Sequence, residues 1–117
     1  MKQVFVIIRP NMYFKTKDLL TENNFLSMSV RDVTARFCHK VDFETIDGRP
    51  VETDISNPFV AKKLISIFCR DEDLDKLIDI VLQVNKTGHE GDGMIYVLDA
   101  VDCERIRTGE KGINAIM

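Results

Sequence analysis

The chain has 117 residues, of which 44% are hydrophobic and 30% charged, and 16 basic against 19 acidic side chains leave a formal net charge of −3 at pH 7. This composition excludes a disordered tail, and the mild acidity makes nucleic acid a poor candidate for a partner. The length fits a single domain over residues 1–117, with a core that needs neither disulfides nor a metal.

Membrane insertion and secretion are not expected. The sequence has no run of about 18 apolar residues, and the apolar run Val4–Ile8 is too short for a signal peptide. The sequence has an odd number of cysteines and no CxxC pair among them: Cys38, Cys69 and Cys103. This pattern favours free thiols in a reducing cytoplasm. Cys38 and His39 could be two metal ligands, but free cysteines are the preferred interpretation because a zinc site needs four ligands.

The first predicted elements are a strand and a helix. Lys2–Arg9 is rich in β-branched residues and apolar on both faces, which is typical of a central strand covered on both sides. Pro10 and Asn11 end this strand. A helix follows over Met12–Asn24, with Leu19 and Leu20 on its inner side and Asn23–Asn24 as its C-terminal stop.

A second strand is predicted over Met28–Arg36, with Val30 and Val33 as its anchors. Residues Phe37 to Phe59 show no strand or helix pattern of apolar residues and contain turn motifs instead. A loop of this length in a small domain is usually functional or mobile.

The second half begins with a strand over Lys62–Arg70. Asp71 is then a candidate helix N-cap, and Gly88 a candidate left-handed stop at the helix end. Between them apolar residues recur at helical spacing, which makes this the clearest amphipathic helix: Leu74, Leu77, Ile78, Val81 and Leu82. Met94–Leu98 is a fourth strand and Glu104–Arg107 a short fifth.

The order β-α-β, long loop, β-α-β predicts an α+β fold, a ferredoxin-like double βαβ sandwich. In such a sandwich both helices cover one face of a four-stranded antiparallel sheet. The other face stays apolar because Phe5 and Ile7 point to it, so we expect the chain to associate with copies of itself.

Three groups of residues suggest anion binding. The segment Thr87–Gly93 contains Gly-Asp-Gly, which suits a backbone nest for phosphate, although the same motif also forms ordinary tight turns. Arg105 and Arg107 would share one strand face and suit a polyphosphate or carboxylate; the alternative is an exposed charged strand. Lys62 is either a strand-end gatekeeper or an anion ligand. No catalytic constellation is found, so an enzyme is not expected.

The segment TGHEGDGMIYVLDAVDCERIRTGEKG resembles the C-terminal signature of the nitrogen regulatory PII signalling family. The start VFVIIRPN and the strand KKLISI resemble that family too, so the likeness covers nearly the whole chain. The runs KVDFE, KKLISI and QVNKTG are most similar to the nitrogenase-associated PII paralogues of archaea and anaerobes.

This resemblance implies a homotrimer whose sheets face inward, with ATP or ADP in the clefts between subunits and 2-oxoglutarate beside Mg²⁺-ATP. It makes residues 37–59 the T-loop, which changes shape with ligand and docks a target of nitrogen metabolism, and residues 108–117 a C-terminal loop. The target would be of the nitrogenase, ammonium transporter or glutamine synthetase type.

The resemblance also implies roles for single residues. For 2-oxoglutarate these are His39, Lys40, Lys62 and Gly91, and His39 would meet Mg²⁺ through Mg²⁺-ATP. For the nucleotide they are Ser29, Ala35, Arg36, Phe37, Cys38, His39, Lys40, Phe68, Gly91, Asp92, Gly93, Met94, Arg105 and Arg107, the two arginines reaching across the subunit boundary.

The sequence departs from the family pattern where the T-loop begins. Ala35 and Phe37 stand where the family has glycines, and Cys38 and His39 replace its arginine and its magnesium-ligating glutamine. Met94 replaces the lysine after Gly-Asp-Gly, and residues 37–59 contain no tyrosine that could be uridylylated. The alternative is therefore a degenerate PII-like interaction protein, acting constitutively or in mixed trimers. A small enzyme of this fold is the least favoured interpretation.

Overall fold

The computed structural model describes residues 1–37, 43–46, 49–52 and 58–116. Its elements in chain order are β1 (Lys2–Ile8), the 3₁₀ turn η1 (Pro10–Met12), α1 (Tyr13–Glu22), β2 (Met28–Ala35), β3 (Phe43–Ile46), β4 (Arg49–Glu52), β5 (Val60–Cys69), the 3₁₀ turn η2 (Asp71–Asp73), α2 (Leu74–Asn85), β6 (Met94–Asp99) and α3 (Ile113–Ile116).

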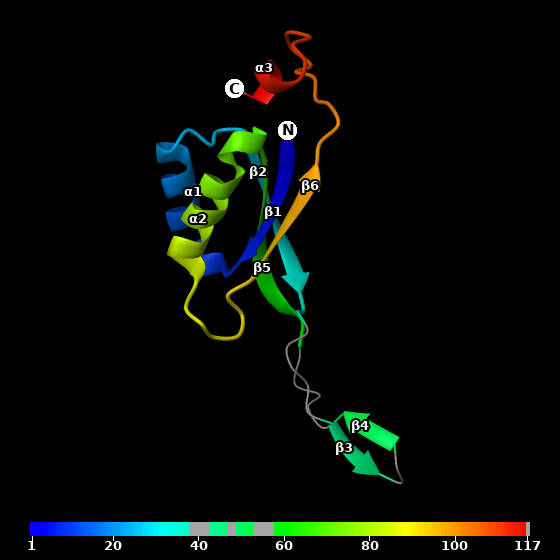
Figure 1. Ribbon diagram of the computed structural model, residues 1–117. Helices are drawn as coiled ribbons and strands as arrows, with labels where there is room; N and C mark the ends of the chain where they lie inside the picture. Colours follow the sequence, from blue (N-terminus) through cyan, green and yellow to red (C-terminus); the bar gives the residue numbers. More distant parts are fainter. Residues whose placement is uncertain (38–42, 47–48, 53–57, 117) are drawn as a thin grey trace.

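The main sheet has four strands in the order β2-β5-β1-β6, and each neighbouring pair is antiparallel. Helices α1 and α2 lie side by side against one face of this sheet (Figure 1). This is the arrangement of a ferredoxin-like sandwich, so the predicted fold class is confirmed.

The core lies between the sheet and the two helices. Val4, Val6 and Ile8 of β1 are buried, and Val4 and Val6 pair with Ile67 and Ile65 of β5. Phe5 and Ile7 alternate with them and point to the opposite face, where they stay half-buried. That second face is apolar and carries neither α1 nor α2, as the sequence predicts.

Helix α1 ends as its two asparagines predict. Asn24 has a positive φ of 67°, and its N–H donates to the carbonyl of Thr21 while the Phe25 N–H donates to that of Leu20. These two bonds satisfy carbonyls that a helix end leaves free. Phe25 is buried in the core, and this packing stabilises the C-terminal end of α1.

Two predictions about the ends of α2 are wrong. Asp71 makes no side-chain cap; it lies in η2, and its carboxylate pairs with the N-terminal ammonium of Met1. Gly88 has a φ of +82°, but α2 already ends at Asn85, and the extended Lys86 follows. Gly88 therefore belongs to the turn between α2 and β6 and not to the end of the helix.

The inner face of α2 is also rotated from the predicted one. Leu77 and Val81 are buried as expected, but Ile80 is buried too, while Leu82 is 44% exposed. In β2 the expected anchors are not core residues: Val30 is 41% exposed and Val33 half-buried, because β2 is an edge strand.

The segment between β2 and β5 is not without regular structure, contrary to the prediction. β3 and β4 pair antiparallel within it as a separate two-stranded sheet, with Phe43 opposite Glu52 and Ile46 opposite Arg49. The predicted site residues Cys38, His39 and Lys40 lie outside the described residues.

The predicted fifth strand, Glu104–Arg107, is a turn. Only Glu104 makes a β-bridge, with Lys111, and the Gly109 N–H donates to the carbonyl of Arg105. Gly109 and Gly112 have φ values of +74° and +65° and fold the chain back on itself. Arg105 and Arg107 therefore do not share a strand face.

Cys69 and Cys103 are free thiols. Burial is the main cause that raises the pKa of the Cys69 thiol. In the part of the chain that is described, no helix is long and apolar enough to cross a membrane, and no three His, Cys, Asp or Glu side chains gather as metal ligands.

Candidate functional site

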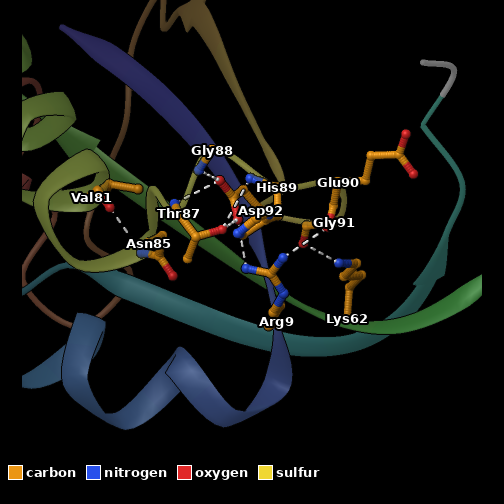
Figure 2. A network of polar contacts seen from close by, with 10 residues as sticks. All are labelled: Arg9, Lys62, Val81, Asn85, Thr87, Gly88, His89, Glu90, Gly91 and Asp92. Carbon is orange, nitrogen blue, oxygen red and sulfur yellow. Dashed lines mark hydrogen bonds and ion pairs between the residues drawn. The ribbon is translucent and has the colours of Figure 1, made fainter. Parts of the chain in front are cut away.

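Asp92 is the centre of a network of polar contacts in the turn between α2 and β6 (Figure 2). Its carboxylate accepts hydrogen bonds from the backbone N–H groups of Thr87 (2.8 Å) and Gly88 (2.9 Å) and from the Thr87 hydroxyl. The bond from the Thr87 hydroxyl is the main cause that holds the pKa of Asp92 well below its usual range. The turn is thus closed around a carboxylate that stays ionised.

Arg9 binds the same turn from the end of β1. Its Nη1 lies 2.7 Å from Oδ1 of Asp92, and its Nη2 donates to the carbonyl of Glu90 at 2.9 Å. The planar guanidinium can make both contacts at once, which a lysine ammonium would do less well. Arg9 was not among the predicted site residues, although it directly follows the apolar strand, as Arg70 does in the second half of the chain.

Lys62 reaches the turn from β5. It is 5% exposed, and its Nζ donates to the carbonyl of Gly91 at 2.6 Å. Burial, followed by the nearby Arg9 charge, lowers the pKa of Lys62, while Asp92 opposes this shift. Two cationic groups therefore converge on the backbone carbonyls of Glu90 and Gly91, in a turn that also carries the carboxylates of Glu90 and Asp92. Converging cations of this kind are suited to an anion.

Conformation requires the glycine at position 91, and both space and conformation require the one at position 93. At Gly91 a Cβ would lie 3.4 Å from Nη2 of Arg9 and 3.6 Å from Nζ of Lys62, and its φ is +90°. At Gly93, with φ +122°, a Cβ would lie 1.9 Å from the carbonyl oxygen of Ile7. The turn can therefore approach β1 only because Gly93 lacks a side chain, while Gly91 supplies the left-handed backbone conformation beside the two cations.

Residues that lead into segment 37–59 lie at the same end of the sheet. Ala35 pairs with Val60, and two register positions away Val33 pairs with Lys62. The Arg36 guanidinium lies over the ring of Phe59, 4.9 Å from its centroid, so this contact joins the two strands that lead into residues 37–59. Phe37 is half-buried, and Met94, at the start of β6, is 40% exposed.

The other predicted nucleotide residues lie farther from the turn, in the middle of the main sheet or toward its opposite end. Ser29 pairs with Ser66, and Phe68 pairs with Gln3 near the start of β1. Arg105 and Arg107 follow β6 on that same side, where the C-terminal segment lies in Figure 1. One copy of the chain therefore does not bring them to the Gly91–Gly93 turn.

Arg105 is anchored within its own chain. Its Nη2 donates to the carbonyl of Ala115 at 3.1 Å, and its Nη1 lies 3.9 Å from the Glu110 carboxylate. A second contact ties the same segment to the start of β2, because the Ser27 hydroxyl donates to the carbonyl of Ile116 at 2.7 Å. Arg107 is exposed.

Comparison with known proteins finds relatives that match nearly the whole chain. The family model described as nitrogen regulatory protein P-II matches residues 1–110. The chain is 36% identical to the nitrogen fixation nifHD region GlnB-like protein 2 of Methanobacterium ivanovii, over all of both chains. It is 35% identical to the protein of the same name from Methanothermobacter marburgensis, over 99% of this chain and 100% of that protein.

A third relative carries the family's general name. The chain is 32% identical to nitrogen regulatory protein P-II 2 of Methanothermobacter thermautotrophicus, over 99% of this chain and 97% of the relative. Members of this family are signalling regulators rather than enzymes. The resemblance drawn from the sequence is thus confirmed: the chain belongs to the P-II family of nitrogen regulatory proteins.

Proposed function

We propose that this protein is a cytoplasmic PII-type signal-transduction protein that binds ATP or ADP, and in addition 2-oxoglutarate, and controls a target of nitrogen metabolism. The observation that carries the proposal is the turn Gly91–Gly93, held by Arg9 and Lys62 through contacts of 2.6–2.9 Å. Its glycines allow close approach, and its two cations suit phosphate and carboxylate groups.

The separation of the site residues supports a homotrimer with nucleotide between its subunits. Arg105 and Arg107 follow β6, whereas the Gly91–Gly93 turn precedes it, and six residues of strand span roughly 20 Å. A second copy can bring its arginines to the turn of the first. The apolar sheet face that includes Phe5 and Ile7 provides the surface on which copies would associate, with the sheets facing inward.

The target would dock through residues 37–59. The contact between Arg36 and Phe59 joins the two strands at the base of this segment, directly beyond the Ala35–Val60 pair, and Lys62 pairs with Val33 two positions further into the sheet. A ligand that changes the surroundings of Lys62 would therefore favour one arrangement of the segment, and the target would bind that arrangement. Two relatives are named for a nitrogen fixation region, so nitrogenase is the preferred type of target.

A degenerate, constitutive PII-like protein is the second candidate. It is favoured by Met94, because a methionine at the start of β6 supplies no charge for a phosphate, and by the Lys62 ammonium, which is already bonded to the Gly91 carbonyl. In that case the protein would bind its partner without nucleotide, alone or in mixed trimers.

Calorimetric titration separates the two candidates. The purified protein is titrated with ATP and with ADP, each with and without Mg²⁺ and 2-oxoglutarate, and light scattering gives its mass. The regulator is expected to be a trimer, to bind nucleotide and to bind 2-oxoglutarate more tightly when Mg²⁺-ATP is present. A trimer that shows neither heat nor a thermal shift with any nucleotide would be the degenerate form.

A further inference from the structure

The short helix α3 folds back onto the start of β2 and the end of β5. The Ser27 hydroxyl donates to the carbonyl of Ile116 at 2.7 Å, and the Phe68 N–H donates to the carbonyl of Ser27 at 3.2 Å, so Ser27 joins all three segments. Ile116 also lines a hollow of about 410 Å³ together with Leu26 and Phe68. Figure 1 shows α3 at the end of the sheet where β1 and β2 begin. The helix is therefore docked on its own subunit.

The same segment holds the side chain of Arg105. Its Nη2 donates to the carbonyl of Ala115 at 3.1 Å, and its Nη1 lies 3.9 Å from the Glu110 carboxylate. The backbone is closed as well, because the Arg105 N–H donates to the Glu110 carbonyl at 2.8 Å and the Gly109 N–H donates to the Arg105 carbonyl at 2.7 Å. The half-buried guanidinium is thus engaged by the residues that follow it in the chain.

These contacts use groups that a phosphate would need. A guanidinium binds phosphate best through two parallel N–H groups, and a carboxylate close to it offsets part of its charge. In Arg105 the Ala115 carbonyl takes one N–H of Nη2, and the Glu110 carboxylate faces Nη1. Full contact between Arg105 and a phosphate therefore requires the guanidinium to leave the C-terminal segment.

Two other predicted nucleotide residues lie where α3 docks. Phe68 is half-buried and shares the hollow with Ile116. Ser29 follows Ser27, the donor to Ile116, by two residues and is exposed. Docking of α3 therefore concerns the whole group of predicted nucleotide residues at this part of the sheet, and not Arg105 alone.

We infer that α3 is an autoinhibitory segment: docked on Ser27 and Arg105, it closes this half of the nucleotide site, and ATP binds after α3 has moved away. The inference rests on the proposed function, because it requires the nucleotide to use Arg105. ATP then binds only the fraction of molecules in which α3 is released, which weakens the apparent affinity in proportion. By the same linkage, bound ATP favours release of α3.

The test weakens the docking contact from both sides in the full-length protein. Ser27→Ala removes the hydroxyl that donates to Ile116, and Ile116→Ser removes the apolar side chain from the hollow. Each should bind ATP about fivefold more tightly than the wild type in calorimetric titration, because a larger fraction of molecules then has α3 released. Ile113→Ser is the matched control: Ile113 belongs to the same helix, is 45% exposed and does not line the hollow, so its ATP affinity should be unchanged.

A second measurement follows α3 directly. Backbone ¹⁵N relaxation of residues 113–116 in the wild type should show lower order at saturating ATP than without it. Light scattering and thermal unfolding check that each variant is a folded trimer, and because the two variants change opposite sides of one contact, either can decide if the other does not fold.

The outcomes separate this inference from the proposed function. If the wild type binds ATP but neither docking variant binds it more tightly, or if ATP raises the order of residues 113–116, the inference is overturned and the proposed function stands. An equal gain in Ile113→Ser would also overturn it. If neither the wild type nor any variant binds a nucleotide, the proposed function fails and the inference fails with it.

Discussion

Arg9 and Asp92 are 83 residues apart in sequence, yet Nη1 of Arg9 lies 2.7 Å from Oδ1 of Asp92. The contact fastens the turn after α2 to the end of the central strand β1. Because β1 is hydrogen-bonded to a strand on each side, β5 and β6, the turn gains a rigid support. A site for an anion benefits from this, since its donors then need little rearrangement when the ligand arrives.

Gly93→Ala tests how closely the turn approaches β1. A Cβ at this position would lie 1.9 Å from the Ile7 carbonyl oxygen, so we expect the free energy of unfolding to fall by about 3 kcal/mol or more. Gly88→Ala is the matched control: its φ is also positive, but a Cβ there meets nothing within 4 Å, and the cost is about 1–2 kcal/mol. Urea denaturation measures both, and equal losses would contradict the close approach.

Arg9→Met tests whether the arginine supports the turn. It removes a charge-assisted bond to Asp92 and a bond to the Glu90 carbonyl, both partly exposed, so the free energy of unfolding should fall by about 1–2 kcal/mol. Hydrogen exchange of the amides of residues 87–93 should become faster. Arg31→Met on the edge strand β2 serves as control and should change stability by less than about 0.5 kcal/mol. If the amides of residues 87–93 still exchange slowly in Arg9→Met, the turn is stable without the arginine.

The Asp92 carboxylate should make the turn sensitive to strong acid. Its pKa in the folded protein is held below the ordinary value of 3.8, chiefly by the Thr87 hydroxyl. A lowered pKa in the folded state contributes stability that is fully present above the unfolded-state value and is lost as the pH falls through the folded-state value. The difference in unfolding free energy between the wild type and Asp92→Asn should therefore be constant above about pH 5 and shrink below pH 4. A difference that grows in acid would contradict this assignment.

Arg105→Ala and Arg107→Ala test the proposed contact across the subunit boundary. Each should weaken ATP binding by about tenfold, because each would lose a charge-assisted bond to phosphate, while light scattering reports an unchanged trimer. Their stabilities should differ: Arg105→Ala also loses the bond to the Ala115 carbonyl and should lower Tm, but Arg107 is exposed and its loss should not. If ATP affinity is unchanged in both variants, the cleft does not contain these arginines.

Local patterns in the sequence predicted much of the fold. The continuous apolar run of β1, the helical spacing of α2 and the asparagines after α1 each act over a few residues, so each is visible in the chain itself. The order of the elements then led to the ferredoxin-like arrangement. The Gly-Asp-Gly motif marked the turn because conformations with positive φ favour glycine.

The predictions that failed depend on contacts between distant segments. Asp71 was expected to cap α2, but the N-terminal ammonium, 70 residues away, takes its carboxylate. The short strand expected at Arg105 became a turn because Ala115 and Glu110 fold back on it. Which of Ile80 and Leu82 is buried depends on how α2 sits on the sheet, and helical spacing alone leaves that rotation open.

The sequence by itself therefore determined the order of the four main-sheet strands and of the two long helices, the apolar second face of the sheet and the glycine turn, since all three follow from residue type and spacing. Only the tertiary structure decided that Arg9 and Lys62 hold this turn and that Arg105 lies at the other end of the sheet. The physical reason is that charge pairing and burial arise between residues that meet only when the chain is folded.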